Sequence, residues 1–239
     1  MQFLDLTLDT PAENLALDEA LLLAAESGSQ TEELLRLWEP REFMVVLGSS
    51  SHVLDEVRLP TCRQRRIEVL RRSSGGAAIL TGPGSLMYAL VLDRRRRPEL
   101  RGIDTTHQWV LETLAEALGR IVPGVARRGI CDLAVRERKF SGNSLRVRRD
   151  WLLYHGTLLY GLPLRLLDAC LGTPPRQPEY RAGRRHSHFV MNLPLDGKTL
   201  REMIRAAFNG AEPPATWPQE LTAQLAADKF GNPDWSYRL

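Results

Sequence analysis

A glycine loop, RRSSGGA over Arg71–Ala77, stands between two apolar runs that are typical of β-strands. Its adjacent glycines allow backbone N–H groups to approach a bound anion closely, and its arginines can donate bidentate hydrogen bonds to phosphate or carboxylate. A further strand-like run at Leu86–Leu92 follows, without the helix that a Walker or Rossmann phosphate loop requires. Neither of those nucleotide-binding folds is therefore predicted. On these residues alone, a tight turn with surface arginines is an equal alternative.

The N-terminal residues predict one helix and then two strands. Thr10 and Glu13 form a T-x-x-E capping box, so a helix is expected over residues 11–27. The short apolar runs Leu34–Trp38 and Phe43–Leu47 are separated by a proline-containing turn. We expect these two runs to pair with each other as strands.

The rest of the chain mixes helical and strand-like patterns. Apolar residues at helical spacing run from Ile103 to Ile121, and short strands are expected between Cys131 and Tyr160. Residues 173–188 are rich in proline and arginine and are predicted to form a long surface loop. Four more helices are expected, at Val53–Gln64, Leu164–Leu171, Leu200–Phe208 and Gln219–Asp228.

The composition is that of an ordinary globular protein, with 43% apolar and 26% charged residues. We expect residues 1–239 to form a single domain with a helical extension at about 212–239. No run of about 18 apolar residues and no signal peptide is recognisable, which favours a cytoplasmic protein without a membrane partner. Cys62, Cys131 and Cys170 are far apart, which indicates reduced thiols rather than disulfides or a zinc site.

The basic residues are almost all arginine. Of 32 basic residues, only Lys139, Lys198 and Lys229 are lysines, and 29 acidic residues reduce the formal net charge to +3. A nucleic-acid binder usually concentrates basic charge and interleaves aromatic residues that stack on bases. No segment of this chain does both, so nucleic-acid binding is not predicted.

Lys139 lies within RKFSGNS, Arg138–Ser144, in a chain that otherwise prefers arginine. An ammonium group is a compact point charge that suits a small anionic or carbonyl oxygen in a narrow site. The pair His155-Gly156 stands in a strand-like run, where a histidine is more often a hydrogen-bonded structural residue than a catalyst. Chance placement of Lys139 and a structural role for His155 are the competing interpretations.

Three motifs occur in order, RRSSGGAAILTGPGS (Arg71–Ser85), RKFSGNS (Arg138–Ser144) and YHGTLL (Tyr154–Leu159). They resemble the catalytic domain shared by lipoate-protein ligases, octanoyltransferases and, more distantly, biotin-protein ligases. The N-terminal NLALDEA (Asn14–Ala20) also resembles the family's opening helix, so the resemblance covers roughly residues 1–200. It implies a mixed α/β fold, with a mixed sheet flanked by helices, related to class II aminoacyl-tRNA synthetases and biotin ligases. The acyl chain would lie in a tunnel beside the glycine loop.

The resemblance implies an enzyme that activates lipoate or octanoate with ATP as an acyl-adenylate and transfers the acyl group to a lysine of a lipoyl domain. That domain would belong to a 2-oxoacid dehydrogenase E2 subunit or to a glycine cleavage H protein. Magnesium would bind mainly through the ATP phosphates, and Asp132 is the one protein side chain that could serve as its ligand. Lys139 is the expected catalytic residue. The expected substrate- and nucleotide-binding residues are Arg72, Ser74, Gly75, Gly76, Ala77, Ser141, Gly142, His155 and Gly156.

The chain departs from the family pattern in two respects. Thr81-Gly82 and Ser85 replace a His-Asp pair and an asparagine that follow the family's glycine loop. The large accessory domain of fully active bacterial ligases is not expected within residues 1–239. A separate accessory subunit would supply that domain, or the activity would differ.

Two alternatives to a ligase stay open. An octanoyl or lipoyl transferase would take its acyl group from acyl-carrier protein, with Cys131, eight residues before Lys139, as the thioester-forming nucleophile. The neighbouring Lys139 and Arg138 would lower the pKa of that thiol, although a small buried filler is the competing interpretation of Cys131. Outside the enzymes, the alternative is a non-catalytic acyl-binding protein.

Overall fold

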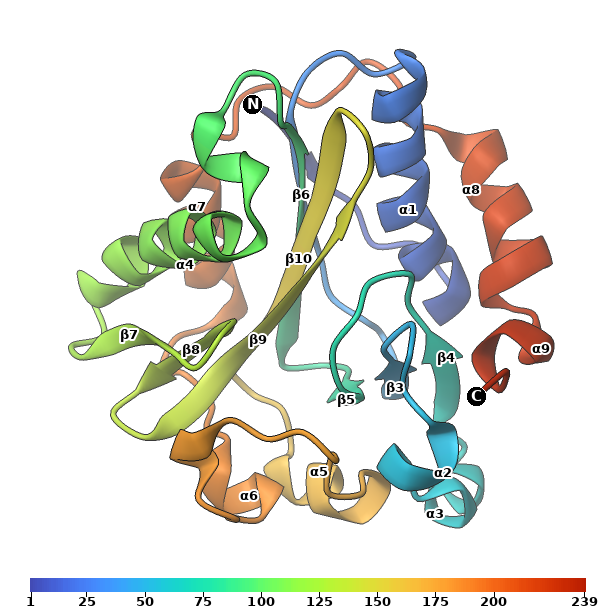
Figure 1. The fold of residues 1–239 in the computed structure, drawn as a ribbon, viewed down its shortest axis with the longest axis vertical. Helices are drawn as coiled ribbons and strands as arrows, with labels where there is room; N and C mark the ends of the chain where they lie inside the picture. The colour runs from blue at the N-terminus through green and yellow to red at the C-terminus, as the bar shows by residue number, and fades with distance from the viewer.

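Two β-sheets form the centre of the computed structural model, which describes residues 1–239. The larger sheet has seven strands in the order β1-β2-β6-β10-β9-β8-β7, and the smaller has three in the order β4-β3-β5 (Figure 1). The pairs β1–β2 and β3–β4 are parallel and the others antiparallel, so both sheets are mixed. The strands are β1 Gln2–Asp5, β2 Leu34–Trp38, β3 Met44–Leu47, β4 Glu68–Arg71, β5 Ile79–Thr81, β6 Ser85–Asp93, β7 Val125–Arg128, β8 Asp132–Val135, β9 Arg138–Val147 and β10 Trp151–Leu159.

The expected pairing of Leu34–Trp38 with the following apolar run is wrong. β2 lies between β1 and β6 in the large sheet, whereas β3 lies between β4 and β5 in the small one. Every residue of both strands is buried, so each strand needs a partner on both edges and cover on both faces. The short connection through Pro40 therefore carries the chain from one sheet to the other.

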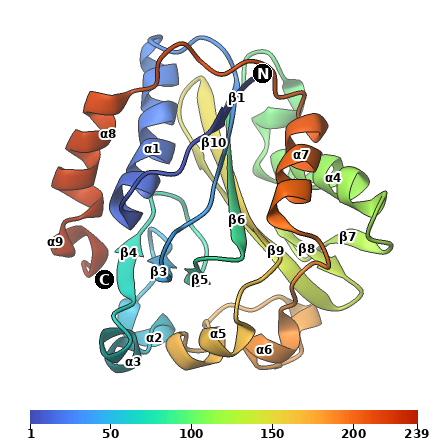
Figure 2. The same ribbon diagram turned by 180° about the vertical axis from the view of Figure 1, so that it is seen from behind.

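Different helices cover the two faces of the large sheet (Figures 1 and 2). In β6, Ala89 and Val91 pack in the cluster that includes α1, whereas Tyr88 and Leu90 pack in the cluster that includes α4 and α7. Successive strand residues point to opposite faces, so a strand covered on both sides must be apolar throughout. The three helices are α1 Pro11–Ser27, α4 Ile103–Gly119 and α7 Gly197–Ala207.

The predicted N-terminal helix is confirmed as α1. The Glu13 backbone N–H donates to Thr10 Oγ1 at 3.2 Å, and the Thr10 backbone N–H donates to the Glu13 carboxylate at 2.9 Å. These two bonds complete the capping box. Gly28, with φ of +85°, ends the helix in the left-handed conformation that glycine adopts most readily.

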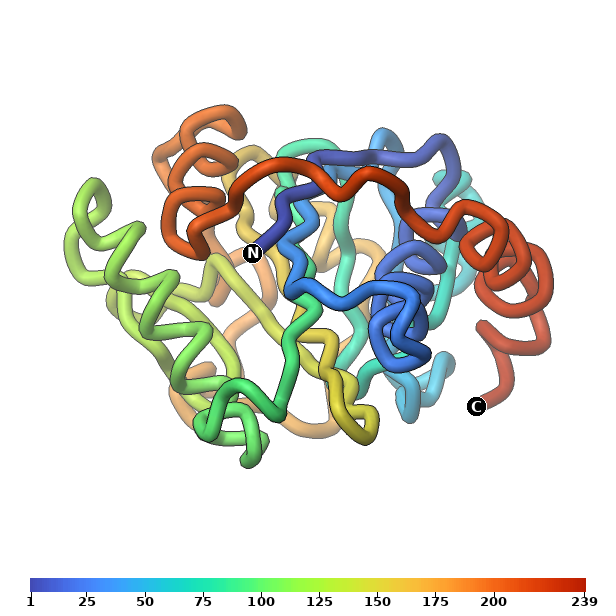
Figure 3. Tube along the Cα trace, turned by 90° about the horizontal axis from the view of Figure 1, so that it is seen from above, coloured from blue at the N-terminus to red at the C-terminus, as the bar shows by residue number.

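The C-terminal helices pack on α1 and on the strand that leads into the glycine loop. α8 (Gln219–Leu225) runs into a π-helical turn (Ala226–Phe230) and then α9 (Pro233–Ser236), so the helix expected at 219–228 is confirmed. Trp235 Nε1 donates to Arg71 O at 2.8 Å, which ties α9 to the end of β4. The connection from α7 to α8 runs beside β1, where the Phe3 N–H donates to Glu212 O (Figure 3).

The helix expected over residues 53–64 is in fact two short helices, α2 (Val53–Glu56) and α3 (Leu59–Gln64). Val57 between them has an extended backbone and forms a β-bridge with Leu171. This tertiary contact interrupts the helical pattern. No helix of the protein has both the length and the apolar character needed to cross a membrane.

Residues 173–188, expected to form a surface loop, are only partly loop-like. They contain the short 3-10 helix Glu179–Arg181 and the start of α6 (His186–Phe189), and Arg181 is 4% exposed. The segment lies against β8, where Tyr180 donates to Asp132, and just beyond it the Met191 N–H donates to Lys139 O on β9. The remaining short helices are η1 Pro98–Arg101 and α5 Leu164–Cys170.

Candidate active site

A cavity of about 200 Å³ lies between the glycine loop, β9, β10 and residues 174–190. It brings together the three motifs, whose lining residues extend from Arg72 to Leu159 in the sequence. Of the predicted site residues, three do not line the cavity: Ser74, Gly75 and Asp132. Those that line it are Arg72, Gly76, Ala77, Cys131, Lys139, Ser141, Gly142, His155 and Gly156.

Lys139 is oriented by a buried carboxylate. Its Nζ lies 2.6 Å from Asp132 Oδ1, and the Asp132 side chain is only 8% exposed. Asp132 belongs to β8, which pairs with β9 through a register shift between Leu133 and Ala134. This irregularity lets the lysine and the aspartate, on neighbouring strands, meet at the cavity.

The glycine in RKFSGNS makes room for the lysine side chain. A Cβ atom at Gly142 would lie 2.8 Å from Lys139 Nζ and 2.9 Å from its Cε. Any larger residue at this position would therefore displace the ammonium group. The position of the Lys139 side chain therefore requires a glycine at position 142.

Both oxygens of Asp132 have partners within the protein. Oδ2 accepts a hydrogen bond of 2.8 Å from the Tyr180 hydroxyl. Burial, with the Asp132 carboxylate beside it, raises the pKa of Tyr180 far above its ordinary value, so the hydroxyl stays a neutral donor. No group of three or more His, Cys, Asp or Glu side chains is arranged to hold a metal ion. Both Asp132 oxygens are thus bonded within the protein, and the role of Asp132 as a magnesium ligand stays a prediction.

Arg72 braces the glycine loop. Its Nη2 donates to Gly75 O at 2.5 Å and to Ala77 O at 3.1 Å, and its Nη1 donates to Val46 O at 3.1 Å. Burial lowers the pKa of Arg72 to about 10, which still leaves it cationic at neutral pH. Each of its nitrogens donates to the protein, so the guanidinium shapes the loop. Arg72 also lines the cavity, and its expected role in binding substrate or nucleotide stays a prediction.

Two glycines allow the loop to pack closely. Gly76 has φ of +90°, a conformation that glycine adopts without strain. A Cβ atom at Gly48, which follows β3, would lie 1.8 Å from Gly76 O. Gly75 is different, because a Cβ atom there would meet no atom within 4 Å.

A chain of buried polar groups runs behind the loop. Ser74 Oγ lies 2.6 Å from His155 Nε2, and His155 Nδ1 lies 3.5 Å from Asp18 Oδ2. Asp18 Oδ1 in turn accepts a 2.6 Å hydrogen bond from Arg36 Nη1. These four residues come from the loop, β10, α1 and β2, so the chain ties four elements together.

Arg72 also contacts this chain of polar groups. Its Nε carries one hydrogen and donates it to Ser74 Oγ at 3.1 Å. Ser74 Oγ therefore links the buried guanidinium to the His155 ring. Contacts on both ring nitrogens hold His155 in one orientation at the wall of the cavity.

Sequence reasoning missed Asp18 and Arg36. An arginine in the middle of the apolar strand Leu34–Trp38 was a usable signal, because a buried guanidinium needs a carboxylate or several carbonyl partners. Arg36 is fully buried and also donates to the carbonyls of Leu6 and Asn14. Asn14 and Asp18 are four residues apart in α1 and so face the same side.

Asn143 was also missed, and it explains why Gly156 is a glycine. Asn143 Oδ1 accepts from the Tyr88 hydroxyl at 2.5 Å, and its Nδ2 donates to Cys131 O at 2.8 Å. A Cβ atom at Gly156 would lie 1.8 Å from Asn143 Oδ1. The small residue on β10 therefore leaves space for the asparagine on β9.

Cys131 lines the cavity, but its environment does not activate it. Burial, followed by the Asp132 carboxylate, raises the pKa of its thiol above the ordinary value, although Lys139 acts in the opposite direction. The expected lowering of this pKa is wrong, since the nearby carboxylate and the burial outweigh the cations. A thiol in this state is a weak nucleophile at neutral pH.

The sequence of this chain is similar to those of known lipoate-protein ligases and an octanoyltransferase. The family model described as the lipoyl protein ligase A/B catalytic domain matches residues 10–209. A candidate lipoate-protein ligase A of Aeropyrum pernix is 32% identical over 151 residues, which cover 63% of this chain and 54% of that protein. The octanoyltransferase LipM of Oceanobacillus iheyensis is 25% identical over 224 residues, which cover 86% of this chain and 81% of that protein. The chain spans about half the length of the first three relatives that it matches.

Solved structures share the fold. A lipoate-protein ligase A bound with ATP superposes with a TM-score of 0.84 at 21% identity, covering 99% of this chain and 98% of that one. A bi-partite lipoate protein ligase of Thermoplasma acidophilum, described with its E2 lipoyl domain, gives a TM-score of 0.78 at 22% identity, covering 99% and 95%. These similarities confirm the expected fold class.

Proposed function

Because the chain belongs to the lipoyl protein ligase A/B catalytic domain family, we propose that it activates lipoate or octanoate with ATP and transfers the acyl group to a lysine of a lipoyl domain. The family is one of enzymes, so the expected membership and enzymatic nature are confirmed. The observation that carries the proposal is the Lys139 ammonium group, held by Asp132 at a cavity that the glycine loop borders.

In the first step, a carboxylate oxygen of the fatty acid attacks the α-phosphorus of ATP. The bond from that phosphorus to the bridging oxygen breaks, and pyrophosphate leaves with its electron pair. Negative charge grows on the α-phosphoryl oxygens in the transition state. Lys139, pre-oriented by Asp132, supplies a point charge for these oxygens, and loop N–H groups near Gly76 add donors.

In the second step, the neutral amine of the acceptor lysine attacks the acyl carbonyl of the adenylate. An amide bond forms, the bond from the carbonyl carbon to the AMP oxygen breaks, and the amine gives up one proton. The carbonyl oxygen becomes an oxyanion beside the same ammonium group. One lysine therefore serves both steps.

Magnesium would be bound chiefly by the phosphates of ATP. Such ions usually keep water and phosphate ligands and need only one or two protein carboxylates. The cavity offers no cluster of three or more metal-binding side chains, which suits an ion that arrives with the nucleotide. When bound, it would neutralise charge on the departing pyrophosphate.

The acyl tail needs an apolar surface, and the cavity provides one. Phe140 of β9, Leu159 of β10 and Phe189 of α6 are among its apolar lining residues. A chain of methylene groups gains about 0.8 kcal/mol for each group that it buries. The apolar lining therefore supports a medium-chain acyl group such as lipoyl or octanoyl.

The second candidate is an acyl transferase that takes octanoate from a carrier protein and uses Cys131. Two observations favour it: Cys131 lines the same cavity as Lys139, and one relative is an octanoyltransferase. Against it, the raised pKa of the Cys131 thiol keeps the nucleophilic thiolate scarce at neutral pH. We therefore place the ligase first.

We also propose that a separate accessory subunit takes part in the reaction, because one structural neighbour is described as a bi-partite lipoate protein ligase. Co-purification with, or activation by, a candidate subunit would test this.

One experiment separates the candidates. The protein is incubated with an apo lipoyl domain and either lipoate with Mg-ATP or octanoyl-carrier protein without ATP, and the mass of the acceptor is recorded. We expect a lipoyl adduct in the first arm alone, with AMP and pyrophosphate as products. Transfer in the second arm would establish the transferase, and no adduct in either would favour an acyl-binding protein.

A further inference from the structure

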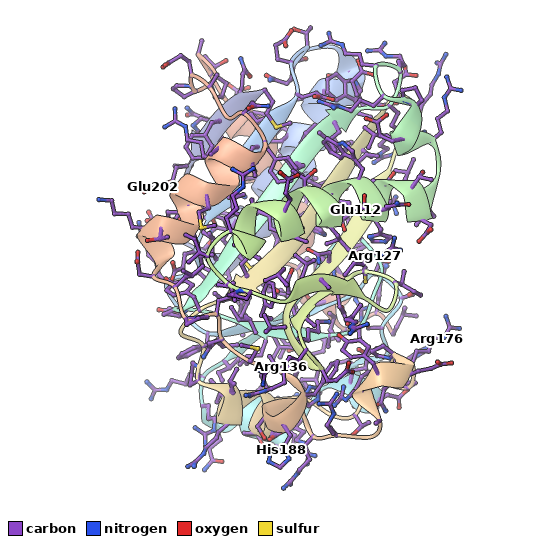
Figure 4. All side chains as sticks on the ribbon, turned by 90° about the vertical axis from the view of Figure 1, so that its left-hand side faces the viewer. Glu112, Arg127, Arg136, Arg176, His188 and Glu202 are labelled. Atoms are coloured by element: carbon purple, nitrogen blue, oxygen red, sulfur yellow. The ribbon has the colours of Figure 1, made fainter.

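Five exposed arginines lie on two segments that border the cavity, and we name them the basic rim: Arg128, Arg136, Arg138, Arg176 and Arg185. They come from two segments, residues 127–139 and 173–188, that pack against each other through Tyr180 and Asp132. Figure 4 shows Arg136, Arg176 and His188 in the lower half of one face, whereas Glu112 and Glu202 lie in its upper half, on α4 and α7. On this face the labelled glutamates thus lie apart from these three basic residues.

The charge count shows how strong this concentration is. Residues 127–139 and 173–188 together hold nine arginines and lysines against three acidic residues, a net charge of +6. The whole chain carries +3, so all the other residues together carry −3. A field of one sign at the mouth of a site attracts a partner of the opposite sign and speeds its association.

Three of the rim guanidinium groups are free to bind a partner. Arg128 pairs with Glu137 at 3.5 Å and Arg138 donates to Val190 O at 2.8 Å. Arg136, Arg176 and Arg185 make no side-chain hydrogen bond or ion pair and are exposed. Hydrogen bonds or ion pairs within the protein therefore do not explain the presence of these three arginines.

A nucleotide inside the cavity does not account for the rim either. Of its five arginines, only Arg176 lines the cavity. The others lie outside it, on β7, on the turn before β9, at the start of β9 and before α6. They are placed to meet a ligand larger than a nucleotide.

An apolar side chain accompanies the rim. Ile130, at the turn between β7 and β8, is 71% exposed. Exposed apolar groups bordered by arginines are common at the centre of protein interfaces. Tyr237, at the other end of the chain, is the one strongly exposed aromatic residue, so the rim lacks the stacking side chains that single-stranded nucleic acids need.

We propose that the basic rim with Ile130 docks a small acidic protein domain, and that this domain is the lysine-bearing acceptor of the proposed reaction. The inference rests on the proposed function, because the acceptor lysine must reach Lys139 and its domain must then cover the mouth of the cavity. Carboxylates around the target lysine would meet the arginines. The basic rim would therefore recognise the acceptor domain, whereas acyl transfer would take place in the cavity.

The test uses the full chain with Arg136 and Arg185 both replaced by glutamate, since neither lines the cavity. The matched control carries Arg63→Glu and Arg65→Glu, an equal charge change at exposed positions on and after α3, away from the rim. Acyl transfer to an apo lipoyl domain is measured at several salt concentrations. Lipoate- and ATP-dependent pyrophosphate exchange, which needs no acceptor, is measured in parallel.

We expect the rim variant to raise the KM for the lipoyl domain at least tenfold at low salt, with the difference closing as salt rises. Pyrophosphate exchange should match the wild type, and the control should match it in both assays. Equal KM values for the rim and control variants would overturn the inference.

Failure of the proposed function would look different. In that case the wild-type protein would show no pyrophosphate exchange, and the rim would be judged by direct binding of a fluorescently labelled apo lipoyl domain. Binding that the rim variant loses supports the docking surface. No binding, or tighter rim-dependent binding of single-stranded RNA, would reject an acidic protein partner.

Discussion

The Nζ of Lys139 and the Oδ1 of Asp132 lie 2.6 Å apart across two neighbouring strands, at the edge of the cavity. The aspartate is almost fully buried and its second oxygen accepts from Tyr180. A buried carboxylate that is bonded on both sides cannot move easily, so it holds the ammonium group in one place. Such pre-orientation is what a transition-state contact requires.

Lys139→Arg should lower acyl transfer at least a hundredfold while the protein stays folded. A planar guanidinium cannot occupy the position of the point charge, and the space beside Gly142 is already filled by the lysine. Loss of such a contact costs about 2.7 to 4 kcal/mol in the transition state. Single-turnover rates and circular dichroism are the measurements, with the exposed Lys198→Arg as control. A rate above about a tenth of wild type would contradict this role.

Two adjacent serines provide a matched pair. Ser74→Ala removes the hydroxyl that accepts from Arg72 and hydrogen-bonds His155, so both partners lose this bond. We expect a loss of about 1 to 3 kcal/mol in the free energy of unfolding and at least tenfold lower activity. Ser73→Ala is the control, because the Ser73 side chain makes no hydrogen bond in the structure. Equal effects of the two changes in denaturant titrations would show that the buried chain is unimportant.

Gly156→Ala should damage the site through Asn143. The new Cβ atom would lie 1.8 Å from Asn143 Oδ1, and overpacking of this kind costs about 1 to 3 kcal/mol. Adding Asn143→Ala should restore part of the stability by removing the clash. Gly119→Ala in α4, where a Cβ atom meets nothing within 4 Å, is the control. Thermal unfolding midpoints of these three variants and of the wild type are the measurement, and an equal midpoint for Gly156→Ala and Gly119→Ala would contradict the prediction.

Cys131→Ser should keep at least about a third of the activity. The raised pKa of the thiol means that its thiolate fraction at any pH is below that of an ordinary cysteine, so it does little as a nucleophile. Alkylation by iodoacetamide should accordingly be slow at pH 7 and accelerate only in more alkaline solution. A hydroxylamine-sensitive octanoyl adduct on Cys131, with inactivity of the serine variant, would instead establish the transferase.

The sequence by itself determined the local secondary structure and the protein family. The capping box of Thr10 and Glu13 specified the start of α1, since its hydrogen bonds join residues three apart. The three motifs identified the family, and they indicated Lys139 as the charge at the reacting centre. The assignment of ATP, the acyl group and the acceptor stays a prediction.

Only the tertiary structure decided which distant residues meet. Apolar periodicity shows that β2 and β3 are buried strands, but it cannot say that they belong to different sheets, because pairing depends on partners far along the chain. The same holds for Asp18, Arg36 and Asn143, whose roles arise from contacts across strands and helices. It also holds for Arg72 and Cys131, because the bonds of a guanidinium and the pKa of a thiol are set by the buried groups that folding places around them.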